Sequence, residues 1–304
     1  MKLFYHPIYS QLDLPAHHRF PISKYQQLFD MLCAHPELKS GFTISCAEPI
    51  SVSTLELAHD ADYVHQFITG TLADKAQKRI GFCHSDALVE RTLQSVGNTL
   101  GAAQAALKDG AAMNLAGGYH HAFGNYGSGF CIFNDAITAA RYLYQAGLID
   151  NALIIDLDVH QGDGSAAIAE RDDVITTLSL HGERNFPRIK QSSDYDFALP
   201  LHCDDRVYLE TLTQALKLTQ RLHRPDIIFY NAGADVHSDD ELGTLSLSLA
   251  GVGARDAQVL THAKYHQIPI CTMLGGGYQR NVEQLVTVHW QLLKQFHQCF
   301  ILDS

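Results

Sequence analysis

The sequence predicts an α/β protein with a central parallel sheet and helices on both faces. Short apolar runs rich in β-branched residues alternate with amphipathic segments of helical length. Such alternation is typical of wound α/β sheets. No internal repeat, low-complexity tract or linker interrupts the 304 residues, so we expect a single domain over residues 1–304.

Four short apolar runs indicate strands of a buried parallel sheet. Each is apolar on both faces, as strands covered by helices on either side should be. They span residues 152–157, 174–180, 226–230 and 268–274, and a further run, 111–116, precedes a pair of glycines. Ligands of such sheets bind beyond the carboxyl ends of the strands, so we expect a site in the residues that follow these runs.

The clearest helix covers residues 86–109. Its apolar residues recur at spacings of four and three and form one stripe, and Gly110 follows where the helix should end. The segments 206–223, 252–266 and 281–298 show weaker versions of the same pattern.

Composition narrows the classes of ligand. The formal net charge is −11, from 33 acidic and 22 basic residues, which argues against nucleic acid because phosphate binding needs clustered Lys and Arg. The acidic surplus suits cationic partners such as lysine-rich protein segments or polyamines, and it also serves solubility. The 18 histidines are a rich supply of metal ligands and proton carriers.

The usual signs of export and membrane insertion are missing from the sequence. No basic region followed by an apolar run starts it, and no apolar stretch approaches the roughly 20 residues of a membrane span. The seven cysteines are scattered without a Cys-x-x-Cys pair, which suits buried thiols in a reducing compartment. We therefore expect a cytoplasmic protein that has neither a disulfide framework nor a membrane anchor.

A candidate metal site follows the run 152–157. Three aspartates and a histidine stand within eight residues of IIDLDVHQGDG, and Asp156, Asp158 and His160 point to one side of an extended chain. A catalytic metal needs a third protein ligand, and Asp235 lies just past another strand. An Asp-rich turn that caps a helix is the plainer alternative. We favour the metal, zinc or ferrous iron, because such packed carboxylates would repel one another without a cation.

Two adjacent histidines follow the glycine pair in GGYHHA. His120 and His121 could be satisfied core residues, but glycines that let the backbone approach a ligand favour a site. A neutral imidazole near a metal-activated water suits a general base, and a second imidazole can carry positive charge. Each needs an acceptor that fixes its tautomer, and Asp156 and Asp163 are the spare carboxylates.

Two weaker motifs complete the candidate site. Three glycines precede Tyr278 in LGGGY, where a phenol could hydrogen-bond a carbonyl oxygen as it becomes an oxyanion. On this motif alone a plain turn is the better interpretation. Phe130, in GSGFCIFND, and Phe186 could line a narrow apolar slot or be ordinary core aromatics. Asn134 or Asp135 is a natural cap for the helix that follows.

Taken together, these segments resemble the histone deacetylase family in the broad sense that includes bacterial and polyamine-directed members. The resemblance rests on GGYHHAFGNYGSGFCIFND, IIDLDVHQGDG, NAGAD and LGGGY, which stand in the family's order, and it runs from about Tyr5 to past Tyr278. The short length and the segment HPIYSQLDLPAHHRFPISKY are most similar to the class IV-like and bacterial branch. The resemblance implies the arginase–deacetylase fold and an amide hydrolase that removes acyl groups from amines.

The resemblance also implies a role for each candidate residue. The zinc ligands would be Asp158, His160 and Asp235. The general base and then acid would be His121, paired with Asp163, beside His120, paired with Asp156, as its electrostatic partner, and Tyr278 would polarise the carbonyl. The residues that contact substrate would be Gly129, Phe130, Phe186, Leu242 and Gly276. A structural potassium ion would bind the carbonyls of Asp156, Asp158, His160 and Leu180 and the side chains of Asp156 and Ser179.

Some features near the rim bear on the substrate. Many family members carry a rim aspartate that grips the substrate backbone, and the matching stretch 80–84 offers none at that position. Leu242 stands where polyamine-directed relatives use a glutamate, with Glu241 adjacent, and Arg19 falls near an arginine that some members place by an internal acetate channel. The substrate is therefore expected to be an acylated lysine in a protein or a small acylated amine, and the oligomeric state is left open.

Two other functions stay open. An arginase-like ureohydrolase shares the fold but uses two manganese ions and extra bridging carboxylates, which the histidine pair matches poorly. A non-catalytic acyl-lysine binding module could keep the fold without the chemistry, although the full set of candidate residues argues against it.

Overall fold

The computed structural model describes residues 1–303 and contains an eight-stranded sheet in which all paired strands run parallel. The strand order is β2-β1-β3-β8-β7-β4-β5-β6. The strands are β1 (Lys2–Phe4), β2 (Thr43–Ser45), β3 (Ala111–Asn114), β4 (Ala152–Asp156), β5 (Ile175–Gly182), β6 (Tyr195–Leu199), β7 (Ile227–Asn231) and β8 (Ile270–Met273).

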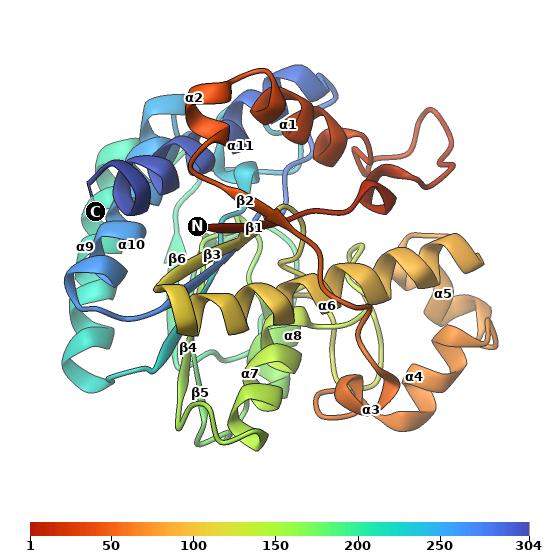
Figure 1. Cartoon of the computed structure of the whole chain (residues 1–304). Helices are drawn as coiled ribbons and strands as arrows, with labels where there is room; N and C mark the ends of the chain where they lie inside the picture. The colour runs from red at the N-terminus through yellow and green to blue at the C-terminus, as the bar shows by residue number, and fades with distance from the viewer. Residues whose placement is uncertain (304) are drawn as a thin grey trace.

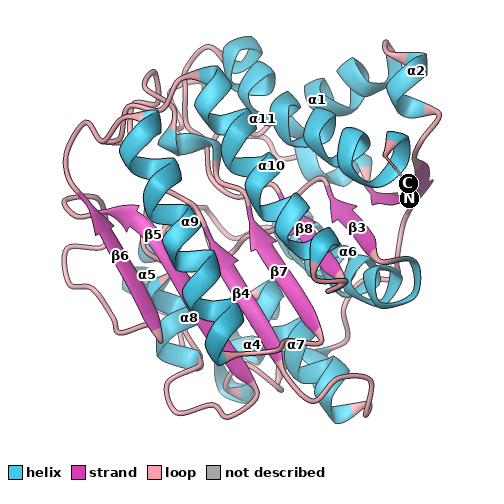
Figure 2. Ribbon diagram, turned by 90° about the vertical axis from the view of Figure 1, so that its left-hand side faces the viewer, coloured by secondary structure: helices cyan, strands magenta, loops and turns pink. Residues whose placement is uncertain are grey.

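Helices cover both faces of this sheet. In Figure 2, α9, α10 and α11 lie in front of the strands, and α7 and α8 lie behind them. Figure 1 shows α4 and α5 together beyond one end of α6. The helices are α1 (Lys24–Cys33), α2 (Pro36–Lys39), α3 (Val52–Leu55), α4 (Ala61–Ile68), α5 (Asp74–Ile80), α6 (Asp86–Asp109), α7 (Asp135–Gln145), α8 (Asp163–Ile168), α9 (Asp205–Leu222), α10 (Leu249–Tyr265) and α11 (Val282–His297), with the short turns η1 (Pro7–Ser10), η2 (Ala234–Val236) and η3 (Gln298–Leu302).

The predicted α/β sheet is confirmed, and the predicted strands and helices agree with the observed ones to within three residues at each end. Both ends of α6 lie where the sequence places them. The side chain of Ser85 accepts a hydrogen bond from the N–H of Leu88 at the start. Gly110 ends the helix with a φ of 87°, a conformation that glycine adopts without strain.

The register of the central strands brings their carboxyl ends to one edge of the sheet. Asp156, the last residue of β4, pairs with Asn231 of β7 and with Ser179 of β5. Asn231 in turn pairs with Met273 of β8. The loops after β4, β7 and β8 therefore emerge side by side, as the rule for ligand sites in parallel sheets requires.

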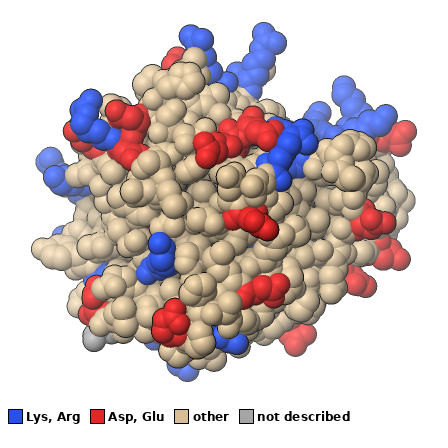
Figure 3. All heavy atoms as spheres, turned by 90° about the horizontal axis from the view of Figure 1, so that it is seen from above, with Lys and Arg blue, Asp and Glu red and all other residues tan. Residues whose placement is uncertain are grey.

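The face of the molecule drawn in Figure 3 carries both basic and acidic side chains. Several Lys and Arg side chains gather at the upper right of this face, with Asp and Glu side chains beside them. Within the described residues, none of the helices combines the length and the apolar character needed to cross a bilayer.

Candidate active site

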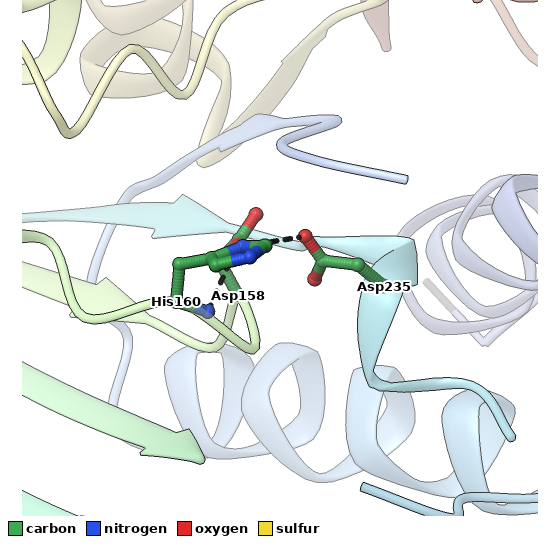
Figure 4. A group of neighbouring side chains, drawn as sticks. All are labelled: Asp158, His160 and Asp235. Atoms are coloured by element: carbon green, nitrogen blue, oxygen red, sulfur yellow. Dashed lines mark hydrogen bonds and ion pairs between the residues drawn. The ribbon is translucent and has the colours of Figure 1, made fainter. Parts of the chain in front are cut away.

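Three predicted metal ligands meet at the sheet edge. Asp158 and His160 lie in the loop after β4 and Asp235 lies in η2 after β7, and their ligand atoms all lie within 4.8 Å of one another. The Nδ1 atom of His160 is 3.0 Å from Oδ1 of Asp158 and 3.2 Å from Oδ2 of Asp235. Figure 4 shows the three side chains pointing toward one another. All three are buried.

These residues fit a small dication. Zinc ligands lie about 2.0–2.2 Å from the metal, so the atoms of a tetrahedral set are roughly 3.3 Å apart, close to the separations seen here. Burial and the neighbouring Asp158 raise the pKa of Asp235. Burial opposes a charge on His160, but the two carboxylates outweigh it and raise the pKa of His160 to about 10. A bound cation would therefore relieve the repulsion between the two buried carboxylates.

Backbone N–H groups hold the two carboxylates in place. Val159 donates to Oδ1 of Asp235 over 2.9 Å, and the N–H of Gly276 donates to Oδ2 of Asp158 over 2.8 Å. A Cβ atom at residue 276 would overlap the carboxylate oxygens of both aspartates. The glycine-rich loop after β8 therefore packs directly on the metal group, by which we mean the side chains of Asp158, His160 and Asp235. The predicted contact of Gly276 with substrate stays a prediction.

Two histidine–carboxylate pairs lie beside the metal group. Nδ1 of His120 is 2.6 Å from Oδ2 of Asp156, and Nδ1 of His121 is 2.6 Å from Oδ1 of Asp163. The ring centroids of the two histidines are 4.0 Å apart. Because each carboxylate accepts the proton on Nδ1, the Nε2 atoms are left to act on a substrate. The catalytic roles themselves stay predictions.

The pKa values of the two imidazoles are shifted in opposite directions. Burial disfavours the charged form of His120, but Asp156 and Asp158 outweigh it and raise its pKa to about 9. Burial and the charge on His120 lower the pKa of His121 to about 4, although Asp163 opposes them. A neighbouring pair whose pKa values are pushed apart is typical of acid–base sites.

Asp135 has a structural role that the sequence did not reveal. Asn134 caps α7, since its side chain accepts from the N–H of Ile137 over 3.1 Å. Asp135 accepts instead from the N–H groups of Gly118, at 3.1 Å, and Tyr119, at 2.8 Å. The buried Asp135 carboxylate therefore fixes the loop that presents the histidine pair, a contact between residues 17 and 16 positions apart that no local pattern signals.

Aromatic side chains surround the approach to the metal group. The ring of Tyr278 lies 6.1 Å from that of His160 and 5.9 Å from that of Phe130. Phe186 packs edge-on against His121 at 4.8 Å and is 46% exposed. Phe186 is therefore a surface residue at the entrance and not a core aromatic. Gly129, with a φ of 54°, lies between Phe186 and His121, where a Cβ atom would press on the imidazole.

The loop that contains Leu242 is tied to the glycine-rich loop through Asp240. Oδ2 of Asp240 accepts from the N–H of Tyr278 over 2.6 Å, and Oδ1 accepts from the N–H of Leu242 over 2.9 Å. Asp240 is buried, and its carboxylate positions the backbone of the tyrosine. This link was not expected from the sequence.

The expected position of Arg19 beside an internal channel stays a prediction. Its guanidinium is half-buried and contacts Oε2 of Glu241 over 2.6 Å. The buried cation beside the glycine-rich loop is Lys24, whose Nζ donates to the carbonyl of Gly275 over 3.1 Å. Burial lowers the pKa of Lys24 to about 8, while Asp235 opposes the shift.

The residues predicted for potassium lie in the same region. Ser179 pairs in register with Asp156, and its hydroxyl is 2.9 Å from Nδ1 of His181. Oδ1 of Asp156 accepts from the N–H of Asp158 over 3.2 Å and from Asn231 over 2.9 Å. Leu180 follows Ser179 within β5. Potassium binding stays a prediction.

Known proteins resemble this chain over most of its length. The model of the histone deacetylase domain matches residues 18–293. The chain is 44% identical over 285 residues to an uncharacterized protein of Picosynechococcus sp., and the match covers 94% of each protein. It is 27% identical to Histone deacetylase 2 of Arabidopsis thaliana, over 88% of this chain and 72% of that protein. It is 30% identical to the acetoin utilization protein AcuC of Bacillus subtilis, over 81% of this chain and 68% of that protein.

A solved structure shares the fold. The chain superposes on the crystal structure of the HDA15 HD domain with a TM-score of 0.81, at 18% sequence identity, over 99% of this chain and 93% of that one.

Proposed function

The chain belongs to the histone deacetylase family of amide hydrolases, and on this premise we propose that it is a zinc-dependent deacylase acting on an acyl-lysine or a small acylated amine. The observation that carries the proposal is the arrangement at the sheet edge. A buried group of two aspartates and a histidine that fits one dication lies beside two histidine–carboxylate pairs. A purely structural cluster of ion pairs would not need the two additional histidine–carboxylate pairs.

The bound metal would be held by Asp158, His160 and Asp235. When bound there, zinc supplies a Lewis acid that polarises the acyl carbonyl and makes a neighbouring water more acidic, from a pKa of about 16 toward about 7. Ferrous iron suits the same mixed ligand set. We further propose a structural potassium ion at the backbone of the same loop, with Ser179 and Leu180 among its ligands.

The proton transfers fall to His121. Its lowered pKa leaves Nε2 unprotonated near pH 7, and Asp163 holds the other ring nitrogen, so the imidazole can take a proton from the attacking water. The same nitrogen then protonates the leaving amine. His120, held by Asp156, contributes positive charge beside it.

Tyr278 stabilises the developing oxyanion. Burial, together with the charges of Asp158 and Asp235, raises the pKa of this phenol well above its ordinary value, so it stays protonated and can donate. Asp240 fixes the backbone that carries it. A hydrogen-bond donor placed in this way lowers the barrier of acyl transfer.

The space behind the site suits a short acyl group. A cavity of about 20 Å³ lies between His120, Tyr278 and the aromatic rings of Tyr25 and Phe130. That volume is about the space of a single water molecule. An acetyl methyl group is of this size, whereas a long acyl chain would need these rings to move. The proposal therefore favours acetyl and other short acyl groups.

The alternatives are less well supported. Among residues 1–303, the side chains that gather as a potential metal site form one group of three, Asp158, His160 and Asp235, which suits one metal better than the two manganese ions of an arginase-like enzyme. A non-catalytic acyl-lysine binding module would not require two imidazoles that are oriented by carboxylates.

A substrate panel tests the proposal. Acetyl-, crotonyl- and long-acyl-lysine peptides and acetylpolyamines are incubated with the zinc-loaded and the metal-stripped protein. We expect release of acetate from at least one acetylated substrate only with metal present. Zinc binding without hydrolysis of any substrate would support the binding module, and release of urea from arginine with manganese would support the ureohydrolase.

A further inference from the structure

A second cavity adjoins the candidate site. Its volume is about 270 Å³, and it lies between residues 14–23, before α1, and residues 278–282, after the glycine-rich loop. Tyr278 and Phe20 line both this cavity and the small one beside His120. The two cavities therefore share part of their walls, including the tyrosine of the proposed mechanism.

Two arginines give this cavity its charge. Arg19 and Arg280 both line it, and no acidic side chain does so among the described residues. Both guanidinium groups contact one oxygen, Oε2 of Glu241, at 2.6 Å for Arg19 and 3.1 Å for Arg280. One carboxylate between two guanidinium groups leaves one positive charge in excess. Each guanidinium has five N–H donors, of which Glu241 engages one.

Two other polar side chains in this region are engaged by the backbone. Asp240 is buried, and its oxygens already accept the N–H groups of Tyr278, Leu242 and Gly243. His18 lies in the cavity wall, where its Nδ1 accepts from the N–H of Phe20 over 3.1 Å and its Nε2 is 2.9 Å from the carbonyl oxygen of Gly81.

We propose that this cavity binds a carboxylate on the amine portion of the substrate, with Arg280 and Arg19 as its partners. The proposal rests on the deacylase function and narrows its substrate class to acylated amines that carry an acidic group, such as an acyl-lysine with a free α-carboxylate. Guanidinium groups bind carboxylates through paired, charge-assisted hydrogen bonds. An acylpolyamine would instead bring an ammonium group to a cavity that already has excess positive charge.

Glu241 has an opposing role in this scheme. Its carboxylate holds the two arginines together and also competes with a substrate carboxylate for them. Replacing it by glutamine should therefore strengthen the attraction for an acidic substrate, while replacing Arg280 should weaken it. The two substitutions should therefore change the preference for an acidic over a neutral substrate, measured as a ratio of kcat/KM values, in opposite directions.

The test compares an acidic substrate with its neutral carboxamide and with a cationic acylated amine. We would measure kcat/KM for Nα,Nε-diacetyl-lysine, for its C-terminal carboxamide and for N-acetylputrescine, at low and high salt. The full-length zinc-loaded protein should prefer the carboxylate over the carboxamide by roughly fivefold to tenfold, and N-acetylputrescine should be the poorest of the three. Added salt should reduce the preference.

The variants decide whether the cavity is responsible. Arg280→Gln should bring the carboxylate-to-carboxamide ratio close to one, and Glu241→Gln should raise it above that of the unmodified protein. Arg221→Gln, an exposed arginine near the end of α9, is the control and should leave the ratio unchanged. Hydrolysis of all three substrates with a ratio that neither variant moves would overturn the carboxylate site and leave the deacylase function standing. Hydrolysis of none would count against the deacylase function itself.

Discussion

His59 provides a quantitative test of how the loop between His121 and α7 is held in place. Its ring is buried between two backbone groups, with Nδ1 3.0 Å from the carbonyl of Phe123 and Nε2 2.9 Å from the N–H of Asn134. The first group needs a donor and the second an acceptor, so the imidazole must be neutral. Burial accordingly lowers the pKa of His59 to about 4.

The pH dependence of stability follows from that shift. In the unfolded chain this histidine binds a proton below a pH of about 6.5, whereas in the folded chain it binds one only below its lowered pKa of about 4. Because the unfolded state binds the additional proton between these values, the free energy of unfolding falls as the pH drops from 6.5 to 4. The full loss is about 3 kcal/mol, at roughly 1.4 kcal/mol for each pKa unit, and about 2 kcal/mol of it is reached by pH 5.

Urea denaturation of His59→Gln measures this effect. The amide of glutamine can still accept from Asn134 but does not titrate, so the variant should be less stable than the unmodified protein at pH 7.5. That difference should shrink by about 2 kcal/mol at pH 5. His17→Gln replaces an exposed histidine and controls for general effects of acid. A stability difference that is the same at both pH values would refute the assignment of a neutral, buried His59.

Further predictions concern the site itself. Tyr278→Phe should lower kcat by about two to three decades, because losing one oxyanion donor costs on the order of 3–4 kcal/mol; near-normal steady-state turnover would remove the tyrosine from the mechanism. Gly276→Ala should weaken zinc binding by at least about tenfold in a chelator competition, because a Cβ atom overlaps two ligand carboxylates, whereas Gly253→Ala, which makes only ordinary contacts, should bind as before. Arg255 is buried and donates to the carbonyls of Gly233 and Leu157 and to Asp256, so Arg255→Leu should lower the free energy of unfolding by about 3–5 kcal/mol; a loss below 1 kcal/mol would show that the pair is dispensable.

The sequence predicts those parts of the structure that are determined by patterns among neighbouring residues. Residues 152–157 are apolar on every face because β4 is buried on both sides. The rule that ligands gather beyond parallel strands placed Asp235 with the segment of Asp158 and His160, although 75 positions separate His160 from Asp235. The rule did not separate Asp156 from the metal ligands, and the structure pairs Asp156 with His120 instead.

The short or half-exposed strands and helices have no apolar pattern from which they could be predicted. β1 and β2 have three residues each, too few for any periodicity to be recognised. β6 alternates between partly buried and exposed residues at the edge of the sheet, so it lacks the continuous apolar run of the central strands. The four-residue helices α2 and α3 complete barely one turn.

Long-range polar contacts could not be predicted for a different reason. Lys24 precedes Gly275 by 251 positions, and Asp240 is 38 positions from the tyrosine whose backbone it holds. In the sequence each is an ordinary surface-type residue, and its burial depends on how distant segments pack. The expected place of Arg19 came from the family resemblance, and the burial of Lys24 at the start of α1 was not expected from the sequence.

The metal content of the purified protein tests the central claim most directly. Elemental analysis of the unmodified chain and of Asp235→Asn, each purified without added metal and assayed on an acetylated substrate, gives metal and activity together. We predict one zinc or iron ion per chain and metal-dependent release of acetate in the unmodified protein, with both lost in the variant. Two manganese ions per chain, or full activity after the metal has been stripped, would contradict the account.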